Sequence, residues 1–314
     1  MRDAIKKVRE AVSSKSPLAY LMHYYVDGGK VYASDGRVTA AAPCPLAGTF
    51  VVPAAELDAV MSKIEGELTF DLQPDKLVVK SGRFRSSIKT LDPSGFSHLL
   101  PTVTPKPLSS SVFNNLARLR AFISDSATHP WALCAYLHGG YAYGTNNVVV
   151  ARVKCEGEIE GLLPCWAIDF ILNREARPTQ VGWDDSHMAF WWEDGSWMRS
   201  QLVAGAFPQQ AIALLDEGFD GLVPITASWK AAYTKVAILS EFEVRMDATS
   251  IRGGRGAADV LVEEPTPQLV EVSIAFNPAF LTPVLEEATA WDLSKHPRVP
   301  FEGNNIRGII MGRT

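Results

Sequence analysis

Basic side chains recur at helical spacing near the start of the chain. Arg2, Lys6 and Arg9 follow one another at intervals of four and three residues, which places them on one face of a helix. An aliphatic stripe that begins at Ile5 occupies another face, so the helix would pack on a core and turn its charges outward. Lysine and arginine displayed in this way suit the phosphates of a nucleic-acid backbone. The alternative is an ordinary solvated helix face.

Later predicted helices carry further basic pairs, and these complete the set of candidate phosphate-binding residues. The pairs are Arg118 and Arg120, Arg174 and Arg177, and Lys230 and Lys235. Two other predicted helices fit this pattern poorly, because 54–64 has Lys63 as its only base and 278–288 has none. We therefore expect an uneven positive surface.

The sequence gives little support to catalytic chemistry. It lacks the G-x-S-x-G nucleophile motif, the P-loop, the dinucleotide fingerprint and the H-E-x-x-H zinc motif. Its six histidines show no metal-ligand spacing. We expect no enzyme activity, no cofactor and no metal.

One alternative class depends on a group of tryptophans. Trp191 and Trp192 are adjacent, with Trp183 and Trp197 nearby, which suggests base stacking or sugar binding by a β-rich enzyme or carbohydrate binder. Neighbouring residues of a strand face opposite sides, so we expect one of the adjacent pair in the core and the other on the outer face. This alternative requires a pocket with converging carboxylates, which the sequence does not indicate.

Composition places the chain among intracellular globular proteins. Hydrophobic residues make up 47% and charged residues 21% of the 314 residues, which is enough apolar material for a core. No apolar run approaches the roughly 20 residues that cross a bilayer, and no signal peptide is evident. The four cysteines lack C-x-x-C spacing, so we expect reduced thiols and a cytoplasmic location. A net charge of −5 leaves room for a basic surface confined to one side.

The chain repeats itself. Residues 28–38 match residues 139–149 without a gap, and the same spacing takes Pro53 to Pro164. A fainter third copy matches Pro53 to Pro278 and Gly28-Gly29 to Gly253-Gly254. Copies this long are whole domains rather than solenoid units. The sequence therefore predicts three domains of one α+β type, at residues 1–104, 105–218 and 219–314.

Each copy is expected to run in the order helix, strands, helix, strands. Apolar residues at helical spacing predict the helices, and alternating runs separated by turn residues predict the strands. After the helix at the start of the chain, we expect helices at 54–64, 110–124, 165–175, 226–240 and 278–288.

Five stretches at matching places along the chain carry a resemblance to a known family. They are 50–57, 204–208, 235–240, 276–281 and 309–313. Their order and spacing resemble those of the bacterial DNA polymerase sliding clamp, the β subunit of DNA polymerase III. The resemblance implies tandem domains of helices and antiparallel sheets, and two chains that close into a ring with helices inside and sheets outside. It also implies a non-enzymatic processivity factor that encircles double-stranded DNA without reading its sequence and tethers the polymerase.

The resemblance further implies an apolar groove in which the polymerase and the clamp loader insert a short linear peptide. The residues that correspond to the family's groove are Leu133, Thr145, Val148, Val149, Val150, Leu215, Ile309, Ile310, Met311 and Arg313. Asn146-Asn147 and Gly312 depart from the family pattern, so the preferred peptide is expected to differ. The aliphatic strand residues have an alternative role in the core.

Two features leave the assembly open. The chain is shorter than typical bacterial relatives and carries no strand before its first helix, as in a trimmed phage-type or divergent member. A second class of function therefore remains, a monomeric adaptor that keeps the peptide groove and has lost ring closure.

Overall fold

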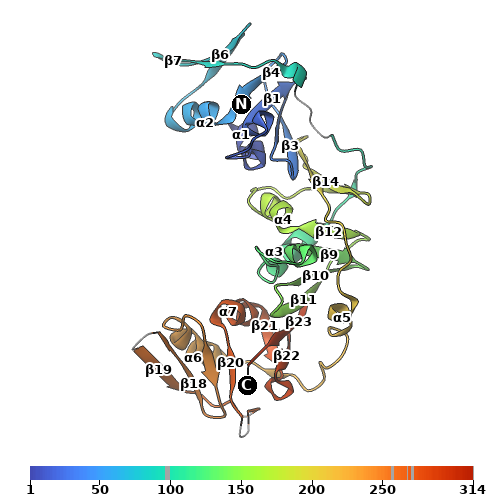
Figure 1. The fold of residues 1–314 in the computed structure, drawn as a ribbon, viewed down its shortest axis with the longest axis vertical. Coiled ribbons are helices and arrows are strands. Elements are labelled where there is room, and N and C mark those ends of the chain that lie inside the picture. Colours follow the sequence, from blue (N-terminus) through green and yellow to red (C-terminus); the bar gives the residue numbers. More distant parts are fainter. Residues whose placement is uncertain (96–99, 256–257, 267, 270–271, 314) are drawn as a thin grey trace. The chain divides into compact units, whose positions relative to one another are not determined.

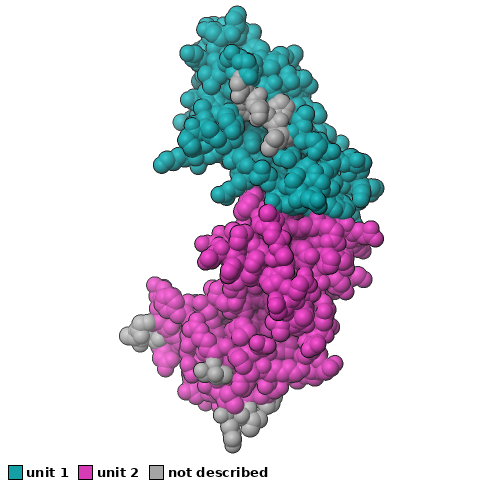
Figure 2. Space-filling model, turned by 45° about the vertical axis from the view of Figure 1, so that its right-hand side comes forward, with its two compact units in different colours: residues 1–110, 169–202 teal, residues 111–168, 203–314 magenta. Residues whose placement is uncertain are grey.

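The computed structural model describes residues 1–95, 100–255, 258–266, 268–269 and 272–313. It divides into two compact units, one made of residues 1–110 and 169–202 and the other of residues 111–168 and 203–314 (Figure 2). Each unit takes in part of the predicted second domain. The reason is that a continuous sheet joins strands from different copies in each unit.

The first unit contains short helices and strands from both of its chain segments, 1–110 and 169–202 (Figure 1). Its elements are α1 (Arg2–Val8), η1 (Arg9–Ala11), η2 (Ala19–Met22), β1 (His23–Asp27), β2 (Lys30–Ser34), β3 (Val38–Pro43), β4 (Phe50–Pro53), α2 (Ala54–Lys63), β5 (Thr69–Gln73), β6 (Lys76–Ser81), β7 (Phe84–Lys89), η3 (Pro93–Gly95), β8 (Lys106–Pro107), β13 (Gln180–Trp183), β14 (His187–Trp191) and β15 (Trp197–Gln201).

Eight strands of this unit form one antiparallel sheet in the order β4-β1-β2-β3-β15-β14-β13-β8. Pairing of β3 with β15, which sets Ala40 opposite Met198, joins its two halves. A separate three-stranded sheet, β5-β6-β7, completes the unit.

The second unit follows the same plan, and its smaller sheet has one more strand among the described residues. Its elements are α3 (Ser111–Arg120), η4 (Pro130–Leu133), β9 (Cys134–His138), β10 (Tyr141–Thr145), β11 (Val149–Lys154), β12 (Gly161–Pro164), the start of α4 (Cys165–Leu172), α5 (Gln209–Ala213), β16 (Val223–Pro224), α6 (Ala227–Ala237), β17 (Val244–Met246), β18 (Ser250–Arg255), β19 (Ala258–Glu263), β20 (Ile274–Phe276), α7 (Pro278–Glu287), β21 (Ala288–Trp291), η5 (Leu293–Lys295), β22 (Arg298–Gly303) and β23 (Ile306–Met311).

The main sheet of the second unit has the order β12-β9-β10-β11-β23-β22-β21-β16. Pairing of β11 with β23 joins its halves and sets Ala151 opposite Gly308. The remaining sheet has the order β19-β18-β17-β20. Strand order, direction and the position of the join are therefore the same in the two eight-stranded sheets.

A further recurring feature is a backbone contact made just after the last strand of each copy. There the chain returns to the strand that precedes the second helix. The three contacts are Leu91 N to Val51 O (2.9 Å), Val203 N to Leu162 O (3.3 Å) and Arg313 N to Ala275 O (2.8 Å). These contacts fix which residues correspond among β7, β15 and β23.

The helices form where the sequence predicts them, with shorter C-terminal ends. The Thr226 side chain caps α6 by accepting from the Trp229 amide, and Asn277 caps α7 ahead of Pro278. Helix α3 buries Val112, Leu116 and Leu119 against its sheet, as its apolar spacing requires.

Two matches of the predicted third copy are wrong. The contacts above make Val51 correspond to Ala275, so Pro53 corresponds to Asn277 and not to Pro278. Gly253 and Gly254 lie inside β18, whereas Gly28-Gly29 forms the turn between β1 and β2. The corresponding turn in the third copy is at 248–249, between β17 and β18. Glycine serves packing at 253, because a Cβ there would lie 1.9 Å from Ser240 Oγ at the end of α6. Among the described residues, no helix is both long and apolar enough to cross a membrane.

Candidate partner groove and basic helix faces

An apolar cluster covers one face of the main sheet in the second unit. Cross-strand pairing places Val150 opposite Ile309, and Tyr143 lies on the same face. Ile309 and Tyr143 are buried in this cluster, with Val150 packed against it. The opposite face packs on α3, because a Cβ at Gly144 would contact Leu119 and Ile123. The cluster therefore lies on the side of the sheet away from α3.

Residues 207–219, which we call the strap, cover this cluster (Figure 1). Two strap residues enter the cluster: Phe207 is buried and stacks on Tyr136 with ring centroids 5.4 Å apart, and Leu215 is also buried. Polar contacts hold the outer part of the strap. Arg152 pairs with Asp216 at 2.5 Å, and Lys295 Nζ donates to the carbonyl of Gly218 at 2.6 Å. The strap is thus fixed to the sheet at both its apolar and its polar ends.

A cavity of about 560 Å³ opens between the strap and the sheet. Leu214 and Ala213 of the strap form one wall, and Pro300 and Ile309 form the floor. The remaining lining residues are Gln210, Glu217, Gly218, Lys295 and Arg298. A cavity with an apolar floor and a charged rim can receive an apolar side chain and orient the chain that carries it.

The structure divides the predicted groove residues between the two sheet faces. Thr145, Val150, Ile309 and Met311 share the face that bears the cavity, because residues two apart on a strand and directly opposed residues face the same way. Leu133 packs against the cluster and Leu215 is buried in it. By the same geometry Val149 and Ile310 face α3, and both are buried.

The other predicted groove residues lie at the end of the strands. Thr145 Oγ1 donates to the carbonyl of Val149 at 2.8 Å and accepts from the Asn147 amide at 3.1 Å, so its hydroxyl shapes the β10–β11 turn. The Val148 carbonyl accepts from the Met311 amide, and Arg313 is exposed beyond β23.

The predicted phosphate-binding residues of the first unit differ in accessibility. Lys6 and Arg9 are exposed. Arg2 donates to the carbonyls of Gly66 and Ile64 beyond α2, and Arg177 donates to those of Ile171, Leu172 and Arg174, closing the end of α4.

Arg174 is the most enclosed of this set. Its guanidinium lies 3.7 Å from the centroid of Trp192 and donates to Ser196 Oγ at 2.8 Å. The side chain is 10% exposed. Burial lowers the pKa of Arg174 to about 10, although the Asp194 carboxylate opposes this shift. Its place is structural, beneath the β14–β15 turn.

In the second unit, Lys235 is exposed and the other predicted bases are engaged. Arg118 pairs with Glu287 at 2.5 Å, and Arg120 pairs with Asp125. Lys230 Nζ donates to the carbonyls of Leu285 and Ala288 at the end of α7. Charge counting along the sequence could not separate Arg118 and Lys230 from the exposed bases, since their partners lie 55 or more residues away in the chain.

Sequence reasoning missed an ion pair between Lys7 and Asp194, with 2.6 Å between Nζ and Oδ2. Burial alone would raise the pKa of Asp194, but hydrogen bonds from Lys7 and Ser196 lower it to about 2. It also missed the aromatic cluster of Tyr136, Tyr143 and Phe207. The alternating aromatics of β9 and β10 were the available signal.

The adjacent tryptophans separate as expected, one into the core. Trp192 is buried, and its Nε1 donates to the Ala176 carbonyl at 2.9 Å. Trp191 is half-buried against the cluster of Tyr25, Tyr32 and Trp197. Both rings serve packing, which leaves neither as an open stacking platform.

No protein-family model matches this sequence, and no curated protein matches it. Solved structures match it over almost its whole length. The sliding clamp of Pseudomonas aeruginosa bound to griselimycin is 19% identical with a TM-score of 0.81, and the DNA polymerase β subunit of Streptococcus pyogenes is 16% identical with a TM-score of 0.84. The β clamp of Helicobacter pylori bound to a DNA ligase peptide is 13% identical with a TM-score of 0.80. Each alignment covers 99% of this chain and 96% of the other.

At these identities the likeness is one of fold. It extends through both units and the four sheets of the described residues, because the alignments leave almost no residue of this chain unmatched. This chain has the fold of the bacterial DNA polymerase sliding clamps.

Proposed function

We propose that this protein is a DNA sliding clamp, a non-enzymatic processivity factor that encircles duplex DNA and tethers a polymerase. The observation that carries the proposal is a strand pairing made twice within the chain, β3 with β15 and β11 with β23. The corresponding strands β19 and β7 each keep an open edge in the described sheets. Open edges invite pairing with another chain. A second copy would make the same pairing at both ends, which gives a homodimeric ring of six domains.

The two open edges have complementary charge. Strand β7 follows Arg83 and carries Arg85 and Lys89, whereas β19 carries Asp259 and Glu263. Correspondence with the two pairings inside the chain sets Val260 opposite Ser86 of the second copy. This register places Glu263 opposite Arg83, where an ion pair supports antiparallel pairing.

Exposed apolar side chains accompany the edge strands. Ile238 is 76% exposed and Phe242 is 70% exposed, just after α6 and beside the sheet that ends in β19. Leu261 on β19 and Phe84 on β7 are also exposed. Large apolar groups left in water at both open edges favour an interface there.

For DNA, the proposal relies on the bases that the fold leaves accessible, namely Lys6, Arg9 and Lys235. A ring holds its DNA topologically, so a few phosphate contacts without base recognition are sufficient. The engaged bases Arg2, Arg118, Arg120, Arg174, Arg177 and Lys230 would then position helices and turns rather than bind phosphate.

For partners, we propose that the polymerase and a clamp loader insert a linear peptide into the cavity beneath the strap. The apolar floor at Ile309 and Pro300 supports this. The Helicobacter pylori clamp was solved with a DNA ligase peptide, which supports peptide binding by proteins of this fold.

Native molar mass by light scattering over a concentration series tests the assembly. We expect twice the 34.3 kDa of one chain at low micromolar concentration. A protein that stays monomeric at every concentration and still binds peptide would instead indicate the monomeric adaptor.

A further inference from the structure

Four arginines continue from the cavity across the neighbouring strands. We call Arg298, Arg313, Arg245 and Arg252 the arginine strip. Arg298 is paired with Met311, and Arg313 follows two residues later. On the neighbouring strands, Arg313 lies opposite Ala275, Ala275 lies opposite Arg245, and Arg245 lies opposite Arg252. Directly opposed residues share a sheet face, so the strip runs across one surface of the second unit.

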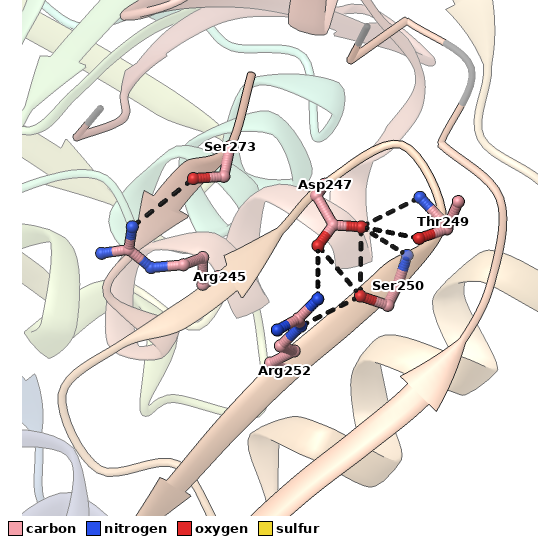
Figure 3. A network of polar contacts seen from close by, with 6 residues as sticks. All are labelled: Arg245, Asp247, Thr249, Ser250, Arg252 and Ser273. Atoms are coloured by element: carbon pink, nitrogen blue, oxygen red, sulfur yellow. Dashed lines mark hydrogen bonds and ion pairs between the residues drawn. The ribbon is translucent and has the colours of Figure 1, made fainter. Parts of the chain in front are cut away.

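The strip keeps an excess of positive charge. Arg252 pairs with Asp247 at 2.9 Å, and Arg245 pairs with Glu243 at 3.0 Å. Figure 3 shows Arg245 and Arg252 on neighbouring strands, with Asp247 held by Thr249 and Ser250. Arg298 and Arg313 are exposed, and within the described ranges neither guanidinium has an ion pair or hydrogen bond. Among the described residues, these two cations therefore lack a charged partner, on a chain whose net charge is −5.

The strip and the cavity form one continuous surface. Arg298 lines the cavity together with Leu214 and Ile309. Met311 lies two residues beyond Ile309 on the same face, is 41% exposed, and separates the cavity from Arg313. A bound chain would thus meet apolar atoms at one end and guanidinium groups at the other.

We infer that the occupant of this surface is a linear peptide whose apolar side chain fills the cavity and whose adjacent carboxylates pair with the arginine strip. The inference rests on the proposed peptide groove and adds its charge preference. Arg245 and Arg252 already have carboxylate partners, whereas Arg298 and Arg313 have none among the described residues, so a peptide carboxylate beside them would gain an ion pair. A nucleic-acid backbone would satisfy the arginines but leave the apolar floor at Pro300 and Ile309 empty.

Selection from a random heptapeptide phage library on the immobilised full chain tests the inference without presupposing a motif. We expect enriched peptides to pair large apolar residues with aspartate or glutamate. The double variant Arg298→Gln/Arg313→Gln should keep the apolar enrichment and lose the acidic one. Apolar enrichment without acidic residues on the wild type would overturn the charge preference and leave the groove standing. Failure of any peptide to be enriched would contradict the groove itself.

The strongest selected peptide is then compared with its version carrying glutamine or asparagine in place of the acids, by fluorescence anisotropy. We expect the amide version to bind the wild type roughly three- to tenfold more weakly, the scale of a few exposed ion pairs. On Arg298→Gln/Arg313→Gln the two peptides should bind equally. The control Lys15→Gln/Lys63→Gln removes the same charge elsewhere and should preserve the difference. A thymidine 20-mer is added as a competitor. If it displaces the peptide from the wild type but not from Arg245→Gln/Arg252→Gln, the strip is a nucleic-acid site and the inference is overturned.

Discussion

Lys7 Nζ lies 2.6 Å from Asp194 Oδ2 and so joins α1 to the turn between β14 and β15. The other unit makes the same connection, because Arg118 of α3 donates to the main-chain carbonyl of Asn304 in the turn between β22 and β23. Lys7 and Arg118 are 111 residues apart, the spacing of the sequence repeat. Lys235 occupies the matching place on α6 and is exposed, as expected if the next turn belongs to a second copy.

The Lys7–Asp194 pair predicts a specific pH dependence of stability. The pKa of Asp194 in the folded protein, about 2, lies below the ordinary value of 3.8 for an aspartate. The pair therefore stabilises the fold above pH 4, and its contribution is lost as pH falls towards 2. Asp194→Asn should lower the free energy of unfolding at pH 7 by at most about 1 kcal/mol, since the pair is partly exposed. Urea denaturation at pH 7 and pH 3 should show the difference from wild type shrinking at the lower pH. A constant difference would contradict this account.

Lys6 and Arg9 are expected to contribute to DNA affinity without affecting assembly. Each phosphate contact adds about 0.9 to the slope of log affinity against log salt concentration. Lys6→Gln/Arg9→Gln should therefore reduce that slope by up to about 2, measured by fluorescence anisotropy with a duplex. The control Lys80→Gln/Lys154→Gln, on exposed strand residues, should leave it unchanged. Equal slopes for all three proteins would remove α1 from the DNA interface.

Phe207 should be essential to the strap. Its ring is buried and contacts Trp131, Tyr136 and Tyr143. Phe207→Ala removes a buried aromatic and should cost about 3–5 kcal/mol of unfolding free energy, with a lower melting temperature in calorimetry. Phe207→Leu keeps most of the apolar volume and should retain peptide binding. Unchanged stability of the alanine variant would show that the strap is not anchored here.

The charges on the open edges should be exchangeable. Glu263→Arg places like charges opposite each other in the proposed dimer and should raise its dissociation constant. Arg83→Glu in the same chain restores the opposite charges and should recover dimerisation, as read by light scattering. If the two substitutions weaken dimerisation additively, the proposed register is contradicted, because residues that form an ion pair have coupled effects on the free energy of dimerisation.

The sequence predicted more of the fold than of the site. Periodicity located the helices, and the repeat anticipated the shared order of strands. Alternation along a strand puts Val149 and Val150 on opposite faces, but the sequence could not tell which of them faces α3 until the strand pairing was known. Nor could it separate Lys6 from Arg174, because the contacts of Arg174 with Trp192 and Ser196 depend on the folded β14–β15 turn. Arg298 escaped notice because its only signal is position beside Met311 on the neighbouring strand.

The most direct test of the clamp is covalent closure around DNA. The proposed register would set Ser87 opposite Asp259 of the second copy, and the four native cysteines are buried. A Ser87→Cys/Asp259→Cys protein, mixed with nicked circular plasmid and treated with a bis-maleimide, should remain on the circle through detergent denaturation and gel electrophoresis. The same plasmid linearised beforehand should release it. If cross-linked dimers dissociate from circular DNA as readily as from linear DNA, the result would contradict a ring around the duplex.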